Sequence, residues 1–225
     1  MIHKRFDCAL LALQGLKTGD AVMVGGFGSA GLPTDLVHAV LDTEVRELTV
    51  VSNNAGYDRE GVAVLIAEGR VRKLICSYPL TAGATAFREA YASGRIELEL
   101  VPQGTLVERI RCAGAGLGGF LSPISAGTPL AFGKPVQRLN GRDYVVESPL
   151  HADFALVRAR LADRIGNLTY HLSGMNFNPI MATAANVVVA EVDAILDLGA
   201  IHPQSVGTPG IFVDRLVVAS VPQVS

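Results

Sequence analysis

Short apolar runs alternate with stretches of helical periodicity through the first half of this 225-residue chain. Runs at residues 21–24, 48–51 and 74–77 predict strands, and residues 96–101 alternate with Glu97 and Glu99 as an edge strand would. Helices are expected between and after them, at residues 36–41, 61–68, 84–93 and 106–113. This alternation requires crossover connections, so it predicts an α/β fold with an open, mostly parallel sheet and flanking helices.

The second half begins with a break in this pattern. Residues 114–141 are rich in glycine, serine and proline and are too long for a simple connection, so we predict a β-flap excursion there. Apolar runs at 144–147, 154–157, 167–170 and 187–192 predict further strands, with a helix at 179–185. We find no internal repeat and expect a single domain over residues 1–225.

Composition and charge disfavour several classes of protein. A chain with 49% hydrophobic and 18% charged residues is globular, and a net charge of −2 without runs of like charge argues against a nucleic-acid partner. The apolar stretches are far shorter than the roughly 20 residues that cross a bilayer, so we expect neither a membrane span nor a signal peptide. Three widely spaced cysteines favour reduced thiols in a cytoplasmic protein, and no Cys or His cluster has the spacing of a zinc site.

The loop after the first expected strand is built largely from glycine. It consists of Gly25, Gly26, Phe27, Gly28, Ser29, Ala30 and Gly31, and residues 26–31 match the G-x-G-x-x-G pattern of dinucleotide sites. Such a site also needs an acidic residue after the second strand, where this chain has serine and asparagine, so nicotinamide or flavin binding is disfavoured. Glycines before a helix start instead predict backbone donors for a phosphate or a developing oxyanion. A tight turn without a ligand is the alternative.

Two further loops place uncharged polar side chains at strand ends. Asn53 and Asn54 follow the second strand, although an Asx turn would explain them equally well. Gln103 and Gly104 follow the fourth strand. Because the carboxyl ends of parallel strands share the edge where α/β sheets bind ligands, we expect these loops to meet the glycine loop in one site.

No residue of the chain is a convincing nucleophile for this expected site. A G-x-S-x-G elbow is absent, the histidines are scattered, and the cysteines lie in patterns that packing explains. Glu147, near a strand end, is a weak candidate for a covalent carboxylate, since its neighbours offer no activation. Glu108 and Arg109 are expected to form a structural ion pair. The predicted site is therefore complete for binding and incomplete for catalysis.

Four motifs occur in the order seen in the A-type subunit of family I 3-oxoacid CoA-transferases. They are Val24-Gly25-Gly26-Phe27-Gly28, Ser52-Asn53-Asn54-Ala55-Gly56, Pro102-Gln103-Gly104-Thr105-Leu106 and Ala152-Asp153-Phe154-Ala155-Leu156-Val157. The chain resembles this family over nearly its whole length, and residues 149–153, 166–170 and 208–213 look closest to the 3-oxoadipate branch, which serves aromatic degradation. The resemblance implies the fold that CoA-transferases share with sugar-phosphate isomerases.

The resemblance also implies a mechanism and a partner. In this family CoA moves between carboxylates through a glutamyl-CoA thioester on the B-type subunit, so this chain would contribute no catalytic nucleophile. Gly25, Gly26, Phe27, Gly28, Ser29, Ala30 and Gly31 would contact CoA, while Asn53, Asn54, Gln103 and Gly104 would hold substrate oxygens. CoA and succinyl-CoA would be substrates, with no permanently bound cofactor and no metal. The implied assembly of the two subunit types is an A2B2 heterotetramer.

Two departures from the family pattern bear on the substrate. Residues 171–179 lack the basic residues that relatives often carry before Asn-Phe, and residues 123–128 lack the tyrosine of the family motif. The missing cations matter most for a dicarboxylic substrate, whose remote carboxylate needs a positive partner. Two other functions stay open: a non-catalytic ligand-binding or sensor domain of the sugar-phosphate isomerase type, and a self-sufficient hydrolase or isomerase that uses Glu147 or a histidine.

Overall fold

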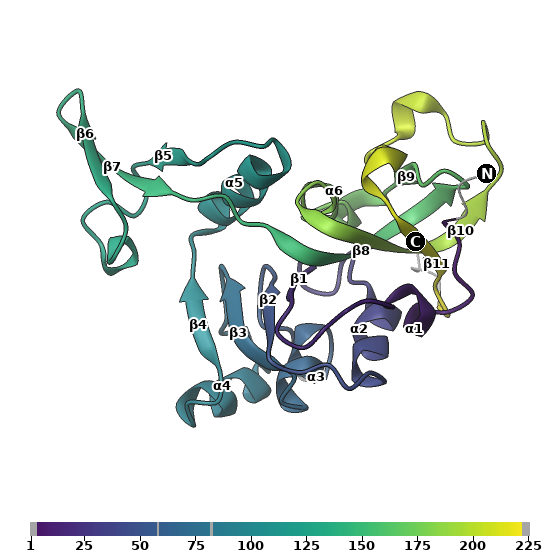
Figure 1. The fold of residues 1–225 in the computed structure, drawn as a ribbon, viewed down its shortest axis with the longest axis horizontal. Helices are drawn as coiled ribbons and strands as arrows, with labels where there is room; N and C mark the ends of the chain where they lie inside the picture. The colour runs from purple at the N-terminus through teal and green to yellow at the C-terminus, as the bar shows by residue number, and fades with distance from the viewer. Residues whose placement is uncertain (1–3, 58, 82, 222–225) are drawn as a thin grey trace.

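The main feature of the fold is an eight-stranded sheet, seen in a computed structural model that describes residues 4–57, 59–81 and 83–221 (Figure 1). The strand order is β11-β10-β8-β1-β2-β3-β4, with β9 paired to β8. All pairings are parallel except that of β8 with β9. The strands are β1 (Ala21–Val24), β2 (Leu48–Val51), β3 (Val71–Cys76), β4 (Glu97–Leu100), β8 (Ala152–Asp163), β9 (Leu168–Thr169), β10 (Ala185–Leu196) and β11 (Arg215–Val218). The prediction of an open, mostly parallel sheet is confirmed.

Helices cover both faces of this sheet. One face packs against α1 (Ala9–Ala12), α2 (Thr34–Leu41), α3 (Val62–Ala67) and α4 (Thr85–Ala92). The other packs against α5 (Gln103–Gly114) and α6 (Asn178–Ala182). Short 3-10 turns, η1 (Pro129–Ala131), η2 (Leu172–Gly174), η3 (Pro203–Ser205) and η4 (Gly210–Phe212), lie in the connections.

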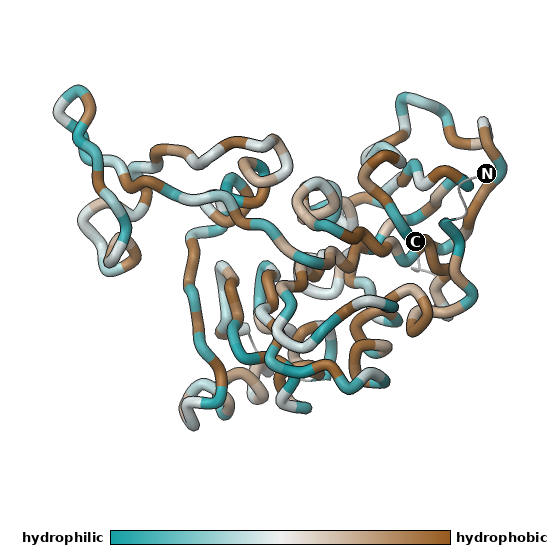
Figure 2. The backbone as a smooth tube through the Cα atoms, in the orientation of Figure 1, coloured by the Kyte–Doolittle hydropathy of each residue, from teal (hydrophilic) through white to brown (hydrophobic). Residues whose placement is uncertain are grey.

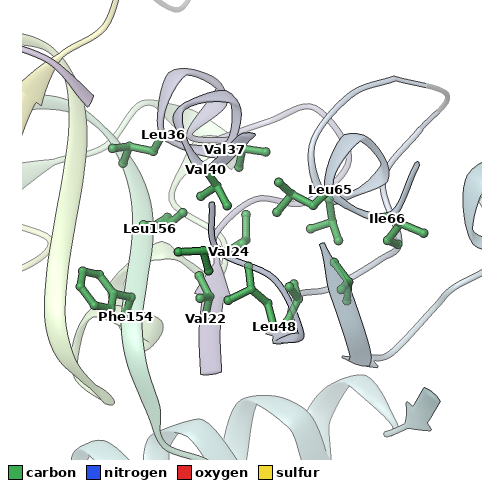
Figure 3. Packing of buried hydrophobic residues seen from close by; sticks show 14 of the residues in the cluster. Val22, Val24, Leu36, Val37, Val40, Leu48, Leu65, Ile66, Phe154 and Leu156 are labelled. Carbon is green, nitrogen blue, oxygen red and sulfur yellow. The ribbon is translucent and has the colours of Figure 1, made fainter. Parts of the chain in front are cut away.

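Burial on both faces explains why the strands read as continuous apolar runs. In β1, Val22 and Val24 belong to the cluster under α2 and α3, whereas Met23 belongs to the cluster under α5 and α6. Figure 3 shows Val22 and Val24 beneath the helical side chains Val40 and Leu65. A strand covered on both sides has no polar face, so its sequence shows no alternation.

A separate three-stranded antiparallel sheet projects from the body as an arm (Figure 1). Its strands are β5 (Phe120–Ser122), β6 (Val136–Leu139) and β7 (Arg142–Glu147), in the order β5-β7-β6. Hydrophilic and hydrophobic segments alternate along this arm (Figure 2). The predicted flap is confirmed, and the run at 144–147 belongs to it as part of β7.

Other elements differ from the sequence-based expectation in length or were not expected. The run at 154–157 is the centre of a twelve-residue strand, β8, that continues through the buried charged residues Arg158 and Asp163. Strand β11 was not predicted. Charged residues inside a strand hide its extent from hydropathy, because only tertiary partners make their burial tolerable. No helix of the described residues combines the length and hydropathy that a membrane crossing needs.

The strand order reverses at β1, since β2, β3 and β4 lie on one side of it and β8, β10 and β11 on the other. In open α/β sheets, ligands bind beyond the carboxyl ends of the strands near such a reversal. The glycine loop follows β1 directly, so the fold places it at the position where a ligand is most expected.

Candidate functional site

An open cleft of about 600 Å³ lies where three of the strand-end loops meet the start of α5. The loops follow β1, β2 and β3, and Gln103 stands in the first turn of α5. Its lining residues are Phe27, Gly28, Asn53, Asn54, Tyr57, Ser77, Tyr78, Thr81 and Gln103. The three loops singled out in the sequence therefore contribute to one cavity. A small adjoining cavity of about 20 Å³ extends from Asn53 and Asn54 toward Gly25 and Gly26.

The glycine loop forms a tight turn at the edge of this cleft. The Phe27 N–H donates to the Ala30 carbonyl at 3.0 Å, and the Ala30 N–H donates back to the Phe27 carbonyl at 3.2 Å. Gly28 has a φ of +62°, which favours glycine. Phe27 and Gly28 line the cleft, and the Phe27 side chain is 52% exposed. Ser29, Ala30 and Gly31 are not among its lining residues.

The glycines of this loop serve different physical purposes. A Cβ on Gly25 would overlap Asn178 Oδ1 and lie 2.7 Å from Asn178 Cγ, and a Cβ on Gly31 would overlap the Gly174 carbonyl oxygen. Close packing against Asn178 of α6 and against Gly174 before it therefore excludes side chains at these two positions. A Cβ on Gly28 would meet only Tyr57, with its nearest atom at 3.6 Å, so at Gly28 the positive φ and the open cleft are the constraints.

Asn53 is held so that its amide group is a free donor. Its Oδ1 accepts hydrogen bonds from Ser77 Oγ at 2.8 Å and from Gln103 Nε2 at 3.0 Å. Its Nδ2 has no acceptor among the described residues, and the side chain lines the cleft. Residues from three loops thus orient one carboxamide, and the N–H groups that it leaves unbonded are available to an oxygen of a ligand.

The side-chain oxygen of Asn54 has a mainly structural role. Its Oδ1 accepts from the Gly56 N–H at 2.8 Å, which is an Asx turn, and Ser52 Oγ donates to the Asn54 carbonyl at 2.6 Å. The turn reading of this loop is thus correct for Asn54 Oδ1. Gly104 lies in the first turn of α5, but outside the lining of the cleft.

The lining of the cleft carries no charge among the described residues. Beneath it, burial raises the pKa of the Cys76 thiol to about 12, so this residue is not a thiolate nucleophile. Sequence reasoning missed Tyr57, Ser77, Tyr78 and Thr81. Ser77 and Tyr78 follow β3 as Asn53 follows β2, so their position at a third strand end was the signal that could have found them.

Glu147 lies outside the cleft, in the arm. Its side chain is 1% exposed, and both carboxylate oxygens are 2.8 Å from Lys134 Nζ. This geometry is that of a structural ion pair. None of the described histidines lines the cleft, and no cluster of three potential metal ligands occurs within the described ranges.

The expected pairing of Glu108 with Arg109 is wrong. Arg109 pairs with Glu99 of β4 at 2.7 Å, and Glu108 pairs with Arg111 at 2.8 Å. Adjacent residues on a helix point in different directions, whereas residues three apart share a face. Burial would raise the pKa of Glu99, but Arg109 and Lys73 hold it below its ordinary value.

Comparison with known proteins decides the family. The sequence pattern of the family "Coenzyme A transferase" matches residues 10–219. The chain belongs to the coenzyme A transferase family. It is 49% identical over 220 residues to the A subunit of a 3-oxoadipate CoA-transferase from Pseudomonas putida, a match that covers 98% of this chain and 95% of that protein. It is 44% identical over 221 residues to the A subunit of a succinyl-CoA:3-ketoacid coenzyme A transferase from Xanthomonas campestris, a match that covers 98% of this chain and 90% of that one.

Among solved structures, this coenzyme A transferase chain is similar to an acyl-CoA transferase from Escherichia coli O157:H7. The TM-score is 0.84 at 23% identity, and the match covers 96% of this chain and 47% of the other. The chain thus spans about half the length of that enzyme, and the likeness supports the fold. The resemblance and the fold class expected from the sequence are both confirmed.

Proposed function

We propose that this chain is the A-type subunit of a succinyl-CoA:3-oxoacid CoA-transferase that uses 3-oxoadipate in aromatic degradation. Two copies of it would join two B-type subunits in the cytoplasm, and free thiols at Cys8, Cys76 and Cys112 are consistent with that compartment. Support for the substrate comes from the 3-oxoadipate transferase of Pseudomonas putida, 49% identical to this chain. No permanently bound cofactor is part of the proposal.

In the proposed reaction, a glutamate carboxylate of the B-type subunit attacks the thioester carbonyl of succinyl-CoA, and CoA leaves as a thiolate. The thiolate attacks the glutamyl carbonyl of the resulting anhydride, which releases succinate and forms a glutamyl-CoA thioester. The carboxylate of 3-oxoadipate attacks this thioester and expels the thiolate. The thiolate then attacks the 3-oxoadipyl carbonyl of the new anhydride, which yields 3-oxoadipyl-CoA and frees the glutamate.

The observation that carries the proposal is a cleft with free neutral donors whose described lining holds hydroxyl groups but no charged group or base to activate one of them as a nucleophile. Each addition step creates a tetrahedral oxyanion, and Asn53 Nδ2 is a preorganised donor for such an oxygen. Gly28 would present its backbone N–H from the glycine loop. A neutral donor set suits a reaction in which the oxygen is uncharged before each addition and charged after it.

The chain should be assayed alone and together with its B-type partner for CoA exchange between succinyl-CoA and 3-oxoadipate or acetoacetate. We expect exchange only when both proteins are present, with a higher kcat/KM for 3-oxoadipate. Borohydride trapping of the thioester should modify the partner. Exchange by this chain alone, or modification of Glu147, would overturn the split site. A preference for acetoacetate would overturn only the assignment of the substrate.

The donor role of Asn53 has its own test. Asn53→Ala removes the carboxamide that Ser77 and Gln103 orient in the cleft, so we expect kcat of the complex to fall by about 100-fold or more. Asn186→Ala is the matched control, because Asn186 is exposed and makes only a 3.5 Å contact with Asp153. Full activity of Asn53→Ala would remove this residue from the oxyanion site.

A further inference from the structure

The segment that leads into α6 holds the glycine loop in place. Asn176 Oδ1 accepts a hydrogen bond from the Gly26 N–H at 3.2 Å, and its Nδ2 donates to the Ala30 carbonyl at 3.0 Å. One side chain therefore bridges the two ends of the turn at Phe27 to Ala30. This residue lies 150 positions beyond Gly26 in the sequence, so the contact exists only in the folded chain.

Asn178 fixes the end of the same loop from within the core. It is fully buried, and its Nδ2 donates to the carbonyl oxygens of Gly31 and Gly174, each at 2.9 Å. Its Oδ1 accepts from the Arg158 N–H of β8 at 2.9 Å. All hydrogen-bonding positions used by this carboxamide connect the loop, the α6 segment and the sheet. A carboxamide suits this place because it donates and accepts without introducing a charge.

These contacts leave the tip of the loop free. The N–H groups of Gly25, Gly26, Phe27 and Ala30 all have acceptors. Those of Gly28, Ser29 and Gly31 have none within the described ranges. Gly28 lines the cleft. The loop is therefore held at its base while a donor at its tip remains available to a ligand.

We propose that Asn176 and Asn178 are positioning residues for CoA transfer, which set the glycine loop so that the free N–H of Gly28 faces the reacting thioester. This inference rests on the proposed function of the loop. Neither asparagine is among the lining residues of the cleft, and each acts through the loop backbone. Displacing a catalytic donor by about 1 Å costs on the order of 100-fold in rate. Loss of the hydrogen bonds from these asparagines to the loop should therefore appear mainly in kcat.

Asn176→Gly is the decisive variant. Asn176 has a φ of +20°, so glycine adopts its backbone conformation, and the substitution removes both contacts to the loop. Asn178→Ala is the second variant, and Asn186→Ala is the exposed control. Each should be examined in the complex with the B-type partner by amide hydrogen exchange and by steady-state CoA exchange at a temperature well below unfolding.

We expect Asn176→Gly to accelerate hydrogen exchange at the bonded amides of Gly26, Phe27 and Ala30. It should also lower kcat about 100-fold while the KM for the 3-oxoacid stays within a few-fold of wild type. Unchanged hydrogen exchange in the glycine loop would refute the claim that Asn176 holds the loop in place. Faster loop exchange with normal kcat would refute the positioning role, because a merely structural contact changes stability without changing kcat. If Asn178→Ala fails to fold, Asn176→Gly still decides between these outcomes.

A wild-type complex without CoA exchange would refute the proposed function, and the positioning role with it. The hydrogen-exchange comparison would still report whether the asparagines hold the loop. Failure of the two ideas is therefore distinguishable.

Discussion

The glycine loop and the projecting arm are held in place by different kinds of contact. The loop has no helix or strand of its own, but the buried side chain of Asn178, from a distant segment, links it to β8. The arm has three paired strands, yet all four residues of β6 are exposed, and Phe132 beside it is 95% exposed. Order at the sheet edge comes from contacts between layers, whereas order in the arm comes from its own hydrogen-bond ladder and a single buried carboxylate.

This difference concerns stability as well as geometry. A contact inside a packed core is coupled to its neighbours, so a small change in volume is felt across layers. A ladder with an exposed strand opens locally without disturbing the core. We therefore expect changes at the loop to affect the whole chain and changes in the arm to remain local.

Gly25→Ala should have the largest effect. Its Cβ would overlap Asn178 Oδ1, so the buried carboxamide must move and abandon its hydrogen bonds. We expect a loss of about 3 kcal/mol or more in the free energy of unfolding, measured by urea denaturation.

Asn178→Ala provides the matched background for this test. It removes every atom of Asn178 that the new Cβ would meet, so Gly25→Ala should be much less destabilising there. Equal destabilisation in both backgrounds would contradict the packing role of Gly25. Recovery of stability without recovery of activity would leave room for a second role of Gly25 toward CoA.

Lys134→Ala should have an intermediate and local effect. It leaves the carboxylate of Glu147 unpaired at 1% exposure, and since Lys134 is itself partly exposed we expect about 2 kcal/mol in the free energy of local opening. Hydrogen exchange should accelerate at residues 136–147 and not at the main sheet. Glu147→Gln, which keeps an acceptor for Lys134, should be milder. Faster exchange throughout the sheet would break the distinction between arm and core.

Glu191, which bonds to α2 beyond the glycine loop, predicts an effect on stability that depends on pH. Glu191 Oε2 accepts from the Leu36 N–H of α2 at 3.0 Å, and Arg158 Nη1 lies 3.7 Å from Glu191 Oε1. Asp193 and Asp35 are the acidic groups nearby. Burial raises the pKa of Glu191 to about 7, although the Leu36 N–H and Arg158 oppose that rise. Between its ordinary value near 4.5 and about 7, the folded chain holds a proton that the unfolded chain releases.

The unfolding free energy contributed by Glu191 should therefore be greatest at low pH and decline as pH rises toward 7, by up to about 1.4 kcal/mol per pH unit. Urea denaturation of wild type and Glu191→Gln between pH 5 and 8 measures this. Gln keeps the acceptor for Leu36 but does not titrate, so its curve should lack this component. Parallel curves would show that Glu191 does not titrate in this range.

Phe132→Ser should have the smallest effect on the chain by itself. A side chain that is 95% exposed contributes little to folding, so the free energy of unfolding should change by less than about 0.5 kcal/mol. Thermal unfolding of the isolated chain measures it. A large loss of stability would mean that the arm tip packs on the body of the molecule, and the contrast between the two regions would fail.

Predictions from the sequence succeeded where a single physical rule, such as the burial of a strand on both faces, determines the local pattern of residues. The buried strands β1, β2 and β3 read as apolar runs because both of their faces are covered. The meeting of Asn53 and Gln103 followed from the rule that parallel strands end at one edge. The expectation that Arg109 pairs with Glu108 was wrong, because the partner of each residue depends on the direction of its side chain.

The sequence by itself determined the layered α/β architecture, the glycine loop after the first strand and the membership of a CoA-transferase family. Only the tertiary structure decided that Gly25 and Gly31 are packing glycines and that Asn176 and Asn178 hold the loop. The reason is that hydropathy and local spacing record which residues are buried near one another in sequence. Which buried carboxamide meets which carbonyl is fixed by the crossing of strands and helices more than a hundred residues apart.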